Sequence, residues 1–259
     1  MGTNDEIEEF RRWKNIPTVL VRRGEELLAQ PYQKIEFTHN PPADDLLNDL
    51  SNYPHAFVLA SVMDRQMKAE KAWLIPYEVS LELGSFNIST LISTSLENLT
   101  GIFVRKHLHR FNQDMAKYFH LAVRRINDKY ENDASKIWRN TPKSASVVRR
   151  FLEFDGVGIK IGTMATNILA RDFKIPFKDK LCIDISPDVQ VMRVFKRLGL
   201  ISENASVDEL IYCARELNPE YPGIFDVSAW EIGRSWCRPS PNGLRCAECY
   251  LDKYCPKIL

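Results

Sequence analysis

Four cysteines near the C-terminus are the residues whose type and spacing most clearly predict chemistry. They follow the pattern C-x8-C-x2-C-x5-C, formed by Cys237, Cys246, Cys249 and Cys255. Thiolates crowded into one short polar loop are typical of a metal centre. A structural zinc site usually takes two C-x2-C pairs, whereas this segment has one pair flanked by two single cysteines. The asymmetry favours a [4Fe-4S] cluster, and zinc is the alternative.

Disulfide bonds are the third interpretation of these cysteines. The other two, Cys182 and Cys213, stand in apolar stretches, and the charged N-terminal sequence lacks the apolar core of a secretion signal. Because disulfides persist in oxidising compartments, these features favour reduced thiols. We expect an intracellular protein, in the cytoplasm or nucleoid if it is prokaryotic. No run of about 18 apolar residues is present, so we expect no membrane partner.

A glycine-rich turn between two amphipathic segments is the second candidate site. Gly156-Val157-Gly158 separates apolar stripes at helical spacing on either side. Such a turn lets the backbone approach a ligand closely, and the helix that follows presents unpaired N–H groups to an anion. A nucleic-acid phosphate fits this description. The alternative is a helical hairpin closed by a glycine cap, with no ligand.

The third segment is a predicted helix from Pro187 to Gly199. Ser186 suits the N-cap, Pro187 suits the first helical position and Gly199 suits the C-terminal end. Asp188 then falls in the first turn, where the helix dipole stabilises a carboxylate. The dipole alone explains an aspartate at this position. It would also keep the carboxylate ionised, which is what stabilising a developing cation requires.

The three segments together resemble a known family. F-D-G-V-G-I-K at 154–160, D-V-Q-V-M-R-V at 188–194 and the four cysteines are similar to the hairpin, aspartate and cluster-loop motifs of the helix-hairpin-helix DNA glycosylases, of the endonuclease III and MutY type. Weaker matches at 55–66 and 232–237 fall in the right order. The resemblance covers roughly residues 50–259. It implies an all-α, two-domain helix-hairpin-helix fold with a [4Fe-4S] cluster loop.

The resemblance assigns catalytic roles to Lys160 and Asp188. Cleaving an N-glycosidic bond develops positive charge on the sugar, so a fixed carboxylate stabilises the transition state. A deprotonated lysine can attack C1′ and hold the sugar as a Schiff base, from which β-elimination cuts the strand. The alternative for Lys160 is a phosphate contact or a solvent-facing position.

The resemblance also implies DNA contacts. Gln66 is the first candidate to fill the gap left by a flipped nucleotide, and the loop 101–110 is a second. A polar residue at a helix end is an equal alternative for Gln66. Phosphate contacts are expected from the glycine turn and from Arg238 and Arg245, although a solvated surface also accounts for these arginines.

The sequence departs from the family pattern at several positions. Asp155 stands where proline is usual, and Gln190 replaces the usual histidine. The interval between Lys160 and Asp188 is also longer, which makes Asp184 a rival for the catalytic aspartate. We prefer Asp188 because only it keeps the spacing to the following Arg-Val. The excised base stays unassigned.

The elements that must position these residues are helical. The chain has 259 residues, 44% of them hydrophobic, which is enough for one large or two small cores, and its net charge of +1 gives no support to a polyanion partner. Helical periodicity predicts ten helices, at 45–52, 55–64, 67–83, 88–96, 112–130, 144–154, 160–171, 187–199, 206–216 and 226–235. The one extended piece is expected near Thr18–Val21. Apolar neighbours at helical spacing predict that Phe57, Trp73, Phe119 and Trp138 are core residues.

We therefore expect a helical domain at 47–172 that ends in the helix-hairpin-helix, and a discontinuous domain of 1–46 plus 173–259 that carries the cluster. Lys160 and Asp188 are expected on opposite walls of a crevice between them. The predicted function is a monomeric DNA N-glycosylase with AP lyase activity on duplex DNA that contains a damaged or mismatched base. There are two alternatives: a monofunctional mismatch or alkylated-base DNA glycosylase that uses only the aspartate, and a non-catalytic, cluster-stabilised DNA-binding protein.

Overall fold

The computed structural model describes residues 4–258, and residues 4–14 as backbone alone. Helices make up its regular structure, and within the described part of the chain the only β-type pairing is an isolated bridge between Cys237 and Leu244. This confirms the predicted all-α class. Over the same residues, no helix combines the length and the apolar character that a membrane span needs.

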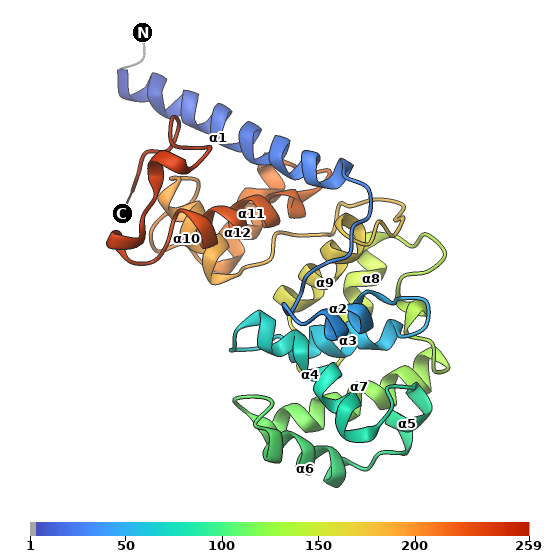
Figure 1. The fold of residues 1–259 in the computed structure, drawn as a ribbon. Coiled ribbons are helices and arrows are strands. Elements are labelled where there is room, and N and C mark those ends of the chain that lie inside the picture. Colours follow the sequence, from blue (N-terminus) through green and yellow to red (C-terminus); the bar gives the residue numbers. More distant parts are fainter. Residues whose placement is uncertain (1–3, 259) are drawn as a thin grey trace. The chain divides into compact units, whose positions relative to one another are not determined.

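The α-helices of the described chain have the following bounds: α1 Asn4–Ala29, α2 Pro41–Asn48, α3 Pro54–Met63, α4 Ala69–Leu83, α5 Ile88–Ser93, α6 Leu96–Lys106, α7 Asn112–Tyr130, α8 Ser144–Leu152, α9 Ile159–Arg171, α10 Val189–Arg197, α11 Val207–Leu217 and α12 Phe225–Ser235. Short 3-10 turns connect some of them: η1 Ala134–Ile137, η2 Pro222–Ile224, η3 Pro241–Gly243 and η4 Cys246–Glu248. Figure 1 shows the helices along the chain.

The chain forms two compact units. Unit 1 comprises Met1–Pro31, Lys143–Ala145 and Phe177–Leu259, and unit 2 comprises Tyr32–Pro142 and Ser146–Pro176. These borders differ from the expected domain boundaries at 46/47 and 172/173. The expected domain boundaries stay a prediction.

Unit 2 is built around α3, whose ten residues are all buried. The helix is apolar on every side, so it has to lie inside the unit, and α4 and α7 pack against it. Phe57 lies at the centre of an aromatic cluster, with its ring centroid 5.6 Å from Trp73, 6.1 Å from Trp138 and 5.4 Å from Phe173. The predicted aromatic core residues are confirmed, since Phe57, Trp73, Phe119 and Trp138 are all buried.

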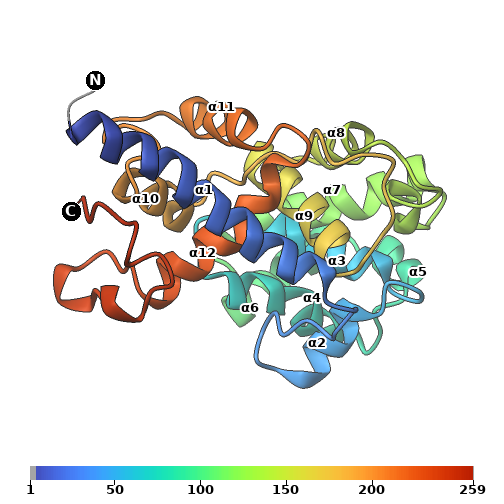
Figure 2. The ribbon, with the colours of Figure 1, turned by 90° about the horizontal axis from the view of Figure 1, so that it is seen from above.

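Unit 1 is built around α12, which packs against both α10 and α1 (Figure 2). Phe195 and Phe225 meet edge to face in its core, with ring centroids 6.0 Å apart. Arg23 of α1 holds both carboxylate oxygens of Glu231 of α12, at 3.0 and 2.8 Å. The first helix of the chain is thereby attached to one of the last.

Two expectations about the elements were wrong. The segment Thr18–Val21 is not extended but belongs to α1, which continues through Pro17. The helix α6 was not expected at all. Its N-cap Ser95 accepts a hydrogen bond from the Asn98 N–H, and its buried face includes Ile102 and Phe103. Because these two side chains are buried in unit 2, the first part of the loop 101–110 is not available as a wedge.

Candidate functional site

The glycine hairpin connects α8 and α9 in unit 2. Gly156 has a left-handed backbone conformation, with φ of +83°, and the Val157 N–H closes the turn on the Phe154 carbonyl at 3.0 Å. Gly158 is the N-cap of α9, and no side chain caps this helix. Gly158 and Ile159 are exposed, so the start of α9 faces solvent. Exposed N–H groups at a helix start suit an anion.

Close packing fixes the glycine at position 156. A Cβ atom there would lie 3.0 Å from both Arg65 Nη1 and Tyr118 Cδ2. The Arg65 guanidinium stacks over the Tyr118 ring, 5.6 Å from its centroid. The hairpin backbone therefore packs against a cation that the sequence analysis did not single out.

Lys160 lies in the first turn of α9 with about one third of its side chain exposed. Its Nζ lies 3.4 Å from Oδ2 of Asp64, whose side chain is only 6% exposed. Asp64 directly follows α3 and was also missed by the sequence analysis. The available signal was a charged residue at the end of a predominantly apolar predicted helix.

Gln66 lies in the turn between α3 and α4, two residues beyond Asp64. It is exposed and has a left-handed backbone, with φ of 49°. This conformation is uncommon for a residue other than glycine. The turn thus presents the glutamine side chain to solvent while Asp64 stays buried.

Asp188 is the N-cap of α10, and its Oδ1 accepts the Gln190 N–H at 2.8 Å. The expected cap, Ser186, is wrong. Both its N–H and its hydroxyl donate to the buried Asp226, at 2.7 and 2.9 Å. The Asp188 carboxylate therefore lies at the positive end of the α10 dipole, where a negative charge is stabilised.

The rival aspartate is engaged elsewhere in unit 1. Asp184 is buried, and its two carboxylate oxygens accept from Arg215 Nε and Nη2, at 2.7 and 2.8 Å. A bidentate pair of this kind fixes an aspartate as part of the structure.

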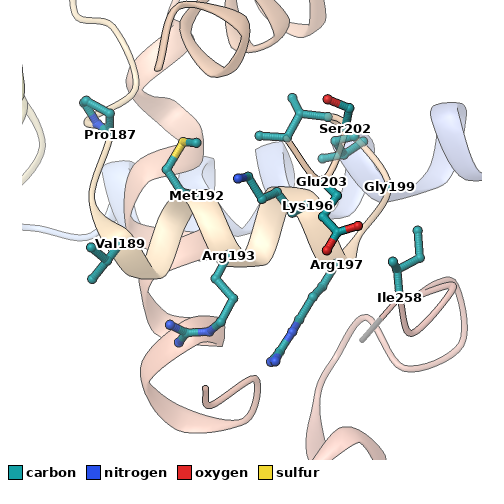
Figure 3. Close-up of a pocket in the computed structure, with 12 residues that line it drawn as sticks. Pro187, Val189, Met192, Arg193, Lys196, Arg197, Gly199, Ser202, Glu203 and Ile258 are labelled. Atoms are coloured by element: carbon teal, nitrogen blue, oxygen red, sulfur yellow. The ribbon is translucent and has the colours of Figure 1, made fainter. Parts of the chain in front are cut away.

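Two arginines of α10 hold the segment around the first cysteine. Arg193 donates to the carbonyls of Cys237, at 2.9 Å, and Gly233, at 2.8 Å. Arg197 donates to the carbonyls of Arg238 and Pro239, at 2.7 and 3.2 Å. Both side chains project from the same side of α10 (Figure 3). The helix capped by Asp188 is thereby tied to the cysteine loop within the same unit.

The four cysteines of the loop influence one another electrostatically. The pKa of Cys249 is raised to about 11, chiefly by burial, with the nearby thiols of Cys255, Cys237 and Cys246 acting in the same direction and a backbone hydrogen bond with Leu251 opposing them. Burial likewise raises the pKa of Cys255, with Cys237 and Cys246 adding to the effect. Two thiols also accept hydrogen bonds, Cys237 from Arg197 Nη1 at 3.5 Å and Cys255 from the Lys257 N–H at 3.4 Å.

This arrangement bears on which metal centre the loop could hold. Among the described side chains, no three of His, Cys, Asp or Glu form a group that could hold a metal ion. The thiols of Cys237, Cys246 and Cys255 are near enough to Cys249 to raise its pKa, and two of the four sulfurs accept N–H donors. Thiolates are the ligands of iron–sulfur clusters, so the residue types of this loop fit such a group.

The remaining predicted DNA contacts lie on the surface of unit 1. Arg238 and Arg245 are both exposed. Arg245 pairs with Glu248, with Nε 2.7 Å from Oε1, so its charge is partly countered. An open groove of about 800 Å³ also runs along α10, and its lining includes Val189, Met192, Lys196 and Ile258 (Figure 3). Pro187 and Val189, on either side of Asp188, both line this groove.

No family model matches the sequence, and no curated protein matches it either. Solved structures do match. A trapped covalent intermediate of endonuclease III with DNA gives a TM-score of 0.60 at 17% identity, covering 99% of this chain and 97% of that one. The chain has the endonuclease III fold. A non-covalent endonuclease III–DNA complex gives 0.63 at 17% identity, covering 95% of both chains.

A thermostable thymine-DNA glycosylase also shares the endonuclease III fold with this chain, with a TM-score of 0.60 at 13% identity, covering 96% of this chain and 97% of that one. The fold expected from the motifs is confirmed. Within it, the glycine hairpin precedes α9, and Asp188 caps α10.

Proposed function

We propose that this protein is a DNA glycosylase that excises a damaged or mismatched base from duplex DNA and then acts as an AP lyase through Lys160. The observation that carries the proposal is the combination, in the endonuclease III fold, of three features: a lysine at the start of the helix after the glycine hairpin, a carboxylate capping α10, and a four-thiol loop. Each feature alone has a structural explanation, whereas the three together match one reaction class.

Base excision is assigned to Asp188. As the N-glycosidic bond breaks, electrons leave with the base and positive charge develops on the sugar. The Gln190 N–H holds the carboxylate at the start of α10, so its negative charge needs no reorganisation when the cation forms. Asp184 is disfavoured for this role because Arg215 occupies both of its oxygens.

Lyase activity is assigned to Lys160. Its neutral amine attacks C1′, the base leaves, and loss of the ring-oxygen bond gives a protonated Schiff base. This iminium acidifies the C2′ proton, and β-elimination then expels the 3′ phosphate. Borohydride reduces the iminium to a stable amine, which links protein and DNA covalently.

DNA binding is assigned to the hairpin and its surroundings. The backbone at Gly156, Val157 and Gly158 approaches a phosphate, which the exposed N–H groups at the start of α9 bind, and Gln66 fills the space left by the flipped nucleotide. Arg238 contacts the backbone. Arg245 contributes less than Arg238, because Glu248 counters its charge. We propose that the protein binds DNA as a monomer.

The cofactor proposal is a [4Fe-4S] cluster held by Cys237, Cys246, Cys249 and Cys255. When bound, the cluster would cross-link residues 237–255 and so stabilise the shape of the loop. Arg193 and Arg197 hold the Cys237 end of this loop through hydrogen bonds of their own.

Borohydride trapping tests the central claim. The protein is incubated with duplexes that each carry one damaged base or an abasic site, and covalent adducts are counted with and without reductant. Lys160→Gln should abolish the adduct, whereas Lys136→Gln should leave it unchanged, since Lys136 is paired with Glu131 on the surface of the same unit. An undiminished adduct in Lys160→Gln would contradict the assignment.

A monofunctional glycosylase is the second candidate function. The observation that favours it is the likeness to a thymine-DNA glycosylase over nearly the whole chain. In that case Asp188 and water suffice. Release of a free base by the parent protein, with no trapped adduct on any duplex, would establish this candidate over the first.

A further inference from the structure

Asp64 is a buried carboxylate that the proposed reaction has not yet used. It stands one residue beyond α3, and its side chain is only 6% exposed. Removing a carboxylate from water is costly unless a partner compensates for its charge. The Lys160 ammonium provides such compensation, with Nζ 3.4 Å from Oδ2. The residue assigned as nucleophile is therefore in contact with a group that can accept a proton.

The turn that carries Asp64 is held firmly. The Asp64 N–H donates to the Ser61 carbonyl at 3.2 Å, and the Arg65 N–H donates to the Met63 carbonyl at 2.8 Å. Burial lowers the pKa of His109, while the carbonyls of Arg65 and Met63 act in the opposite direction, so this buried histidine packs against the same turn. The carboxylate thus has a fixed position instead of the freedom of a surface side chain.

The next residue strengthens the connection to the hairpin. Arg65 stacks on Tyr118 and lies against Gly156, so the turn touches the hairpin at 156 through Arg65 and at 160 through Asp64. Two consecutive residues therefore fix the turn against the segment that carries the nucleophile. An ion pair formed only for surface solubility would not need this support.

We propose that Asp64 is the immediate proton acceptor for Lys160, an inference that rests on the lyase function proposed above. One proton moves from the Lys160 ammonium to Asp64 Oδ2, leaving a neutral amine beside a neutral carboxylic acid. The two atoms are 3.4 Å apart, so the transfer needs no intervening water. The amine lone pair then attacks C1′ of an abasic aldehyde, and Asp64 returns the proton to the oxygen that departs as water.

The test is a single-turnover measurement of borohydride-trapped adduct on a duplex with a natural abasic site, together with binding to a duplex that carries a non-reactive tetrahydrofuran abasic analogue. Asp64→Asn keeps the size of the side chain and removes its ability to accept a proton. The adduct-forming rate should fall about 10²-fold, the usual contribution of general base catalysis, with the binding constant unchanged. Asp64→Glu should recover part of the rate. Asp64→Ser gives the same information if the amide disturbs folding.

The outcomes separate this inference from the function on which it depends. An unchanged rate in the variants that lack the carboxylate would overturn the inference, and so would a parallel loss of binding and rate, which would make Asp64 structural. If the parent forms no adduct, or if Lys160→Gln still forms one, the lyase function fails first. A rate loss with intact binding, partly recovered by glutamate, supports the inference.

Discussion

At the scale of single residues, two aspartates four positions apart have opposite surroundings. Asp188 caps a helix and accepts one backbone N–H, whereas Asp184 is buried and holds the Arg215 guanidinium with both oxygens. The first arrangement leaves a charge near a helix start, where it can act on a ligand. In the second arrangement, both carboxylate oxygens are bound to Arg215, so the aspartate has a structural role. The two residues therefore make a matched pair for mutation.

Asp188→Asn should lower the rate of base excision by about 10²–10³-fold, because the amide loses the charge that stabilises the developing cation. Folding should be nearly unaffected, since asparagine is as good an N-cap as aspartate. The measurement is single-turnover release of free base, with urea unfolding as a check on stability.

Asp184→Asn is the control, and we expect it to lower stability while leaving base excision intact. Breaking the pair with Arg215 should lower the free energy of unfolding by about 1.5–3 kcal/mol, while excision by the folded fraction is retained. A larger loss of excision at Asp184 than at Asp188 would show that Asp184, and not Asp188, is the catalytic aspartate.

The limits of prediction from sequence are also visible at this scale. Lys160 and Asp188 were found because their types stand at fixed positions in short motifs. Ser186 and Asp188 are both good N-caps, and sequence alone cannot choose between them. The choice depends on Asp226, which lies 40 positions after Ser186 in the sequence. Its carboxylate accepts hydrogen bonds from both the N–H and the hydroxyl of Ser186. Asp64 was missed for the same reason, since its partner Lys160 is 96 residues distant.

At the scale of elements, local periodicity predicted most of the helices, because their apolar stripes repeat at helical spacing. The two failures have separate causes. The helix α1 was not predicted because Pro17 lies inside it and its first residues are charged. It packs against α12, which comes near the other end of the chain. In α6, a glycine at position 101 and a polar surface suggested a loop, although Ile102 and Phe103 are buried.

The hairpin gives an element-scale prediction that separates folding from binding. At Gly156, alanine would have to adopt a left-handed backbone and would press on Arg65 and Tyr118. Gly156→Ala should therefore destabilise the protein by at least about 1–2 kcal/mol. At Gly158 no atom lies within 4 Å of an added Cβ, so Gly158→Val should fold normally.

Gly158→Val should instead weaken binding to damaged and undamaged duplexes by a similar factor, because a side chain now obstructs the approach of a phosphate. The slope of log affinity against log salt should fall by about one, the value for one lost phosphate contact. Binding titrations at several salt concentrations measure both effects. An unchanged affinity and slope would mean that the hairpin has an architectural role alone.

The cysteine loop gives a second element-scale prediction. Protein purified without oxygen should be brown, with a broad absorption near 400 nm and about four irons per chain. Cys249→Ser should lose iron and bind DNA more weakly, whereas Cys213→Ser should keep both, since Cys213 is buried in α11 and its thiol donates to the Leu200 carbonyl at 3.4 Å. One zinc per chain and no iron would contradict the cluster proposal.

At the scale of the whole molecule, the histidines distinguish the two units, because they all lie in unit 2. All five, His39, His55, His107, His109 and His120, belong to unit 2. Burial lowers the pKa of three of them, His55, His109 and His120, from the ordinary value of 6.5. These three favour the neutral form in the folded protein, whereas unfolded histidine takes up a proton below that value. Unit 2 should therefore lose stability as the pH falls, with unit 1 free of this effect.

The direction of this pH dependence follows from the proton uptake of the unfolded chain. Below pH 6.5 the unfolded chain binds more protons than the folded one, so the free energy of unfolding decreases with falling pH, by up to about 1.4 kcal/mol per pH unit for each histidine. Urea unfolding at pH 7.5 and 5.5 measures the change, and amide hydrogen exchange should place it in residues 32–142. His55→Gln should reduce the pH dependence, while the exposed His107→Asn should not.

The attachment of α1 to α12 has a consequence for how the chain is made. Arg23 and Glu231 are 208 positions apart, so at a synthesis rate of roughly 5–20 residues per second the first helix leaves the ribosome about 10–40 s before its partner. Throughout that interval, the buried face of α1, which includes Ile16 and Leu20, has no α12 to cover it. The nascent chain must therefore keep the apolar face of α1 from aggregating until α12 is made, which makes α1 a natural client for a chaperone at the ribosome.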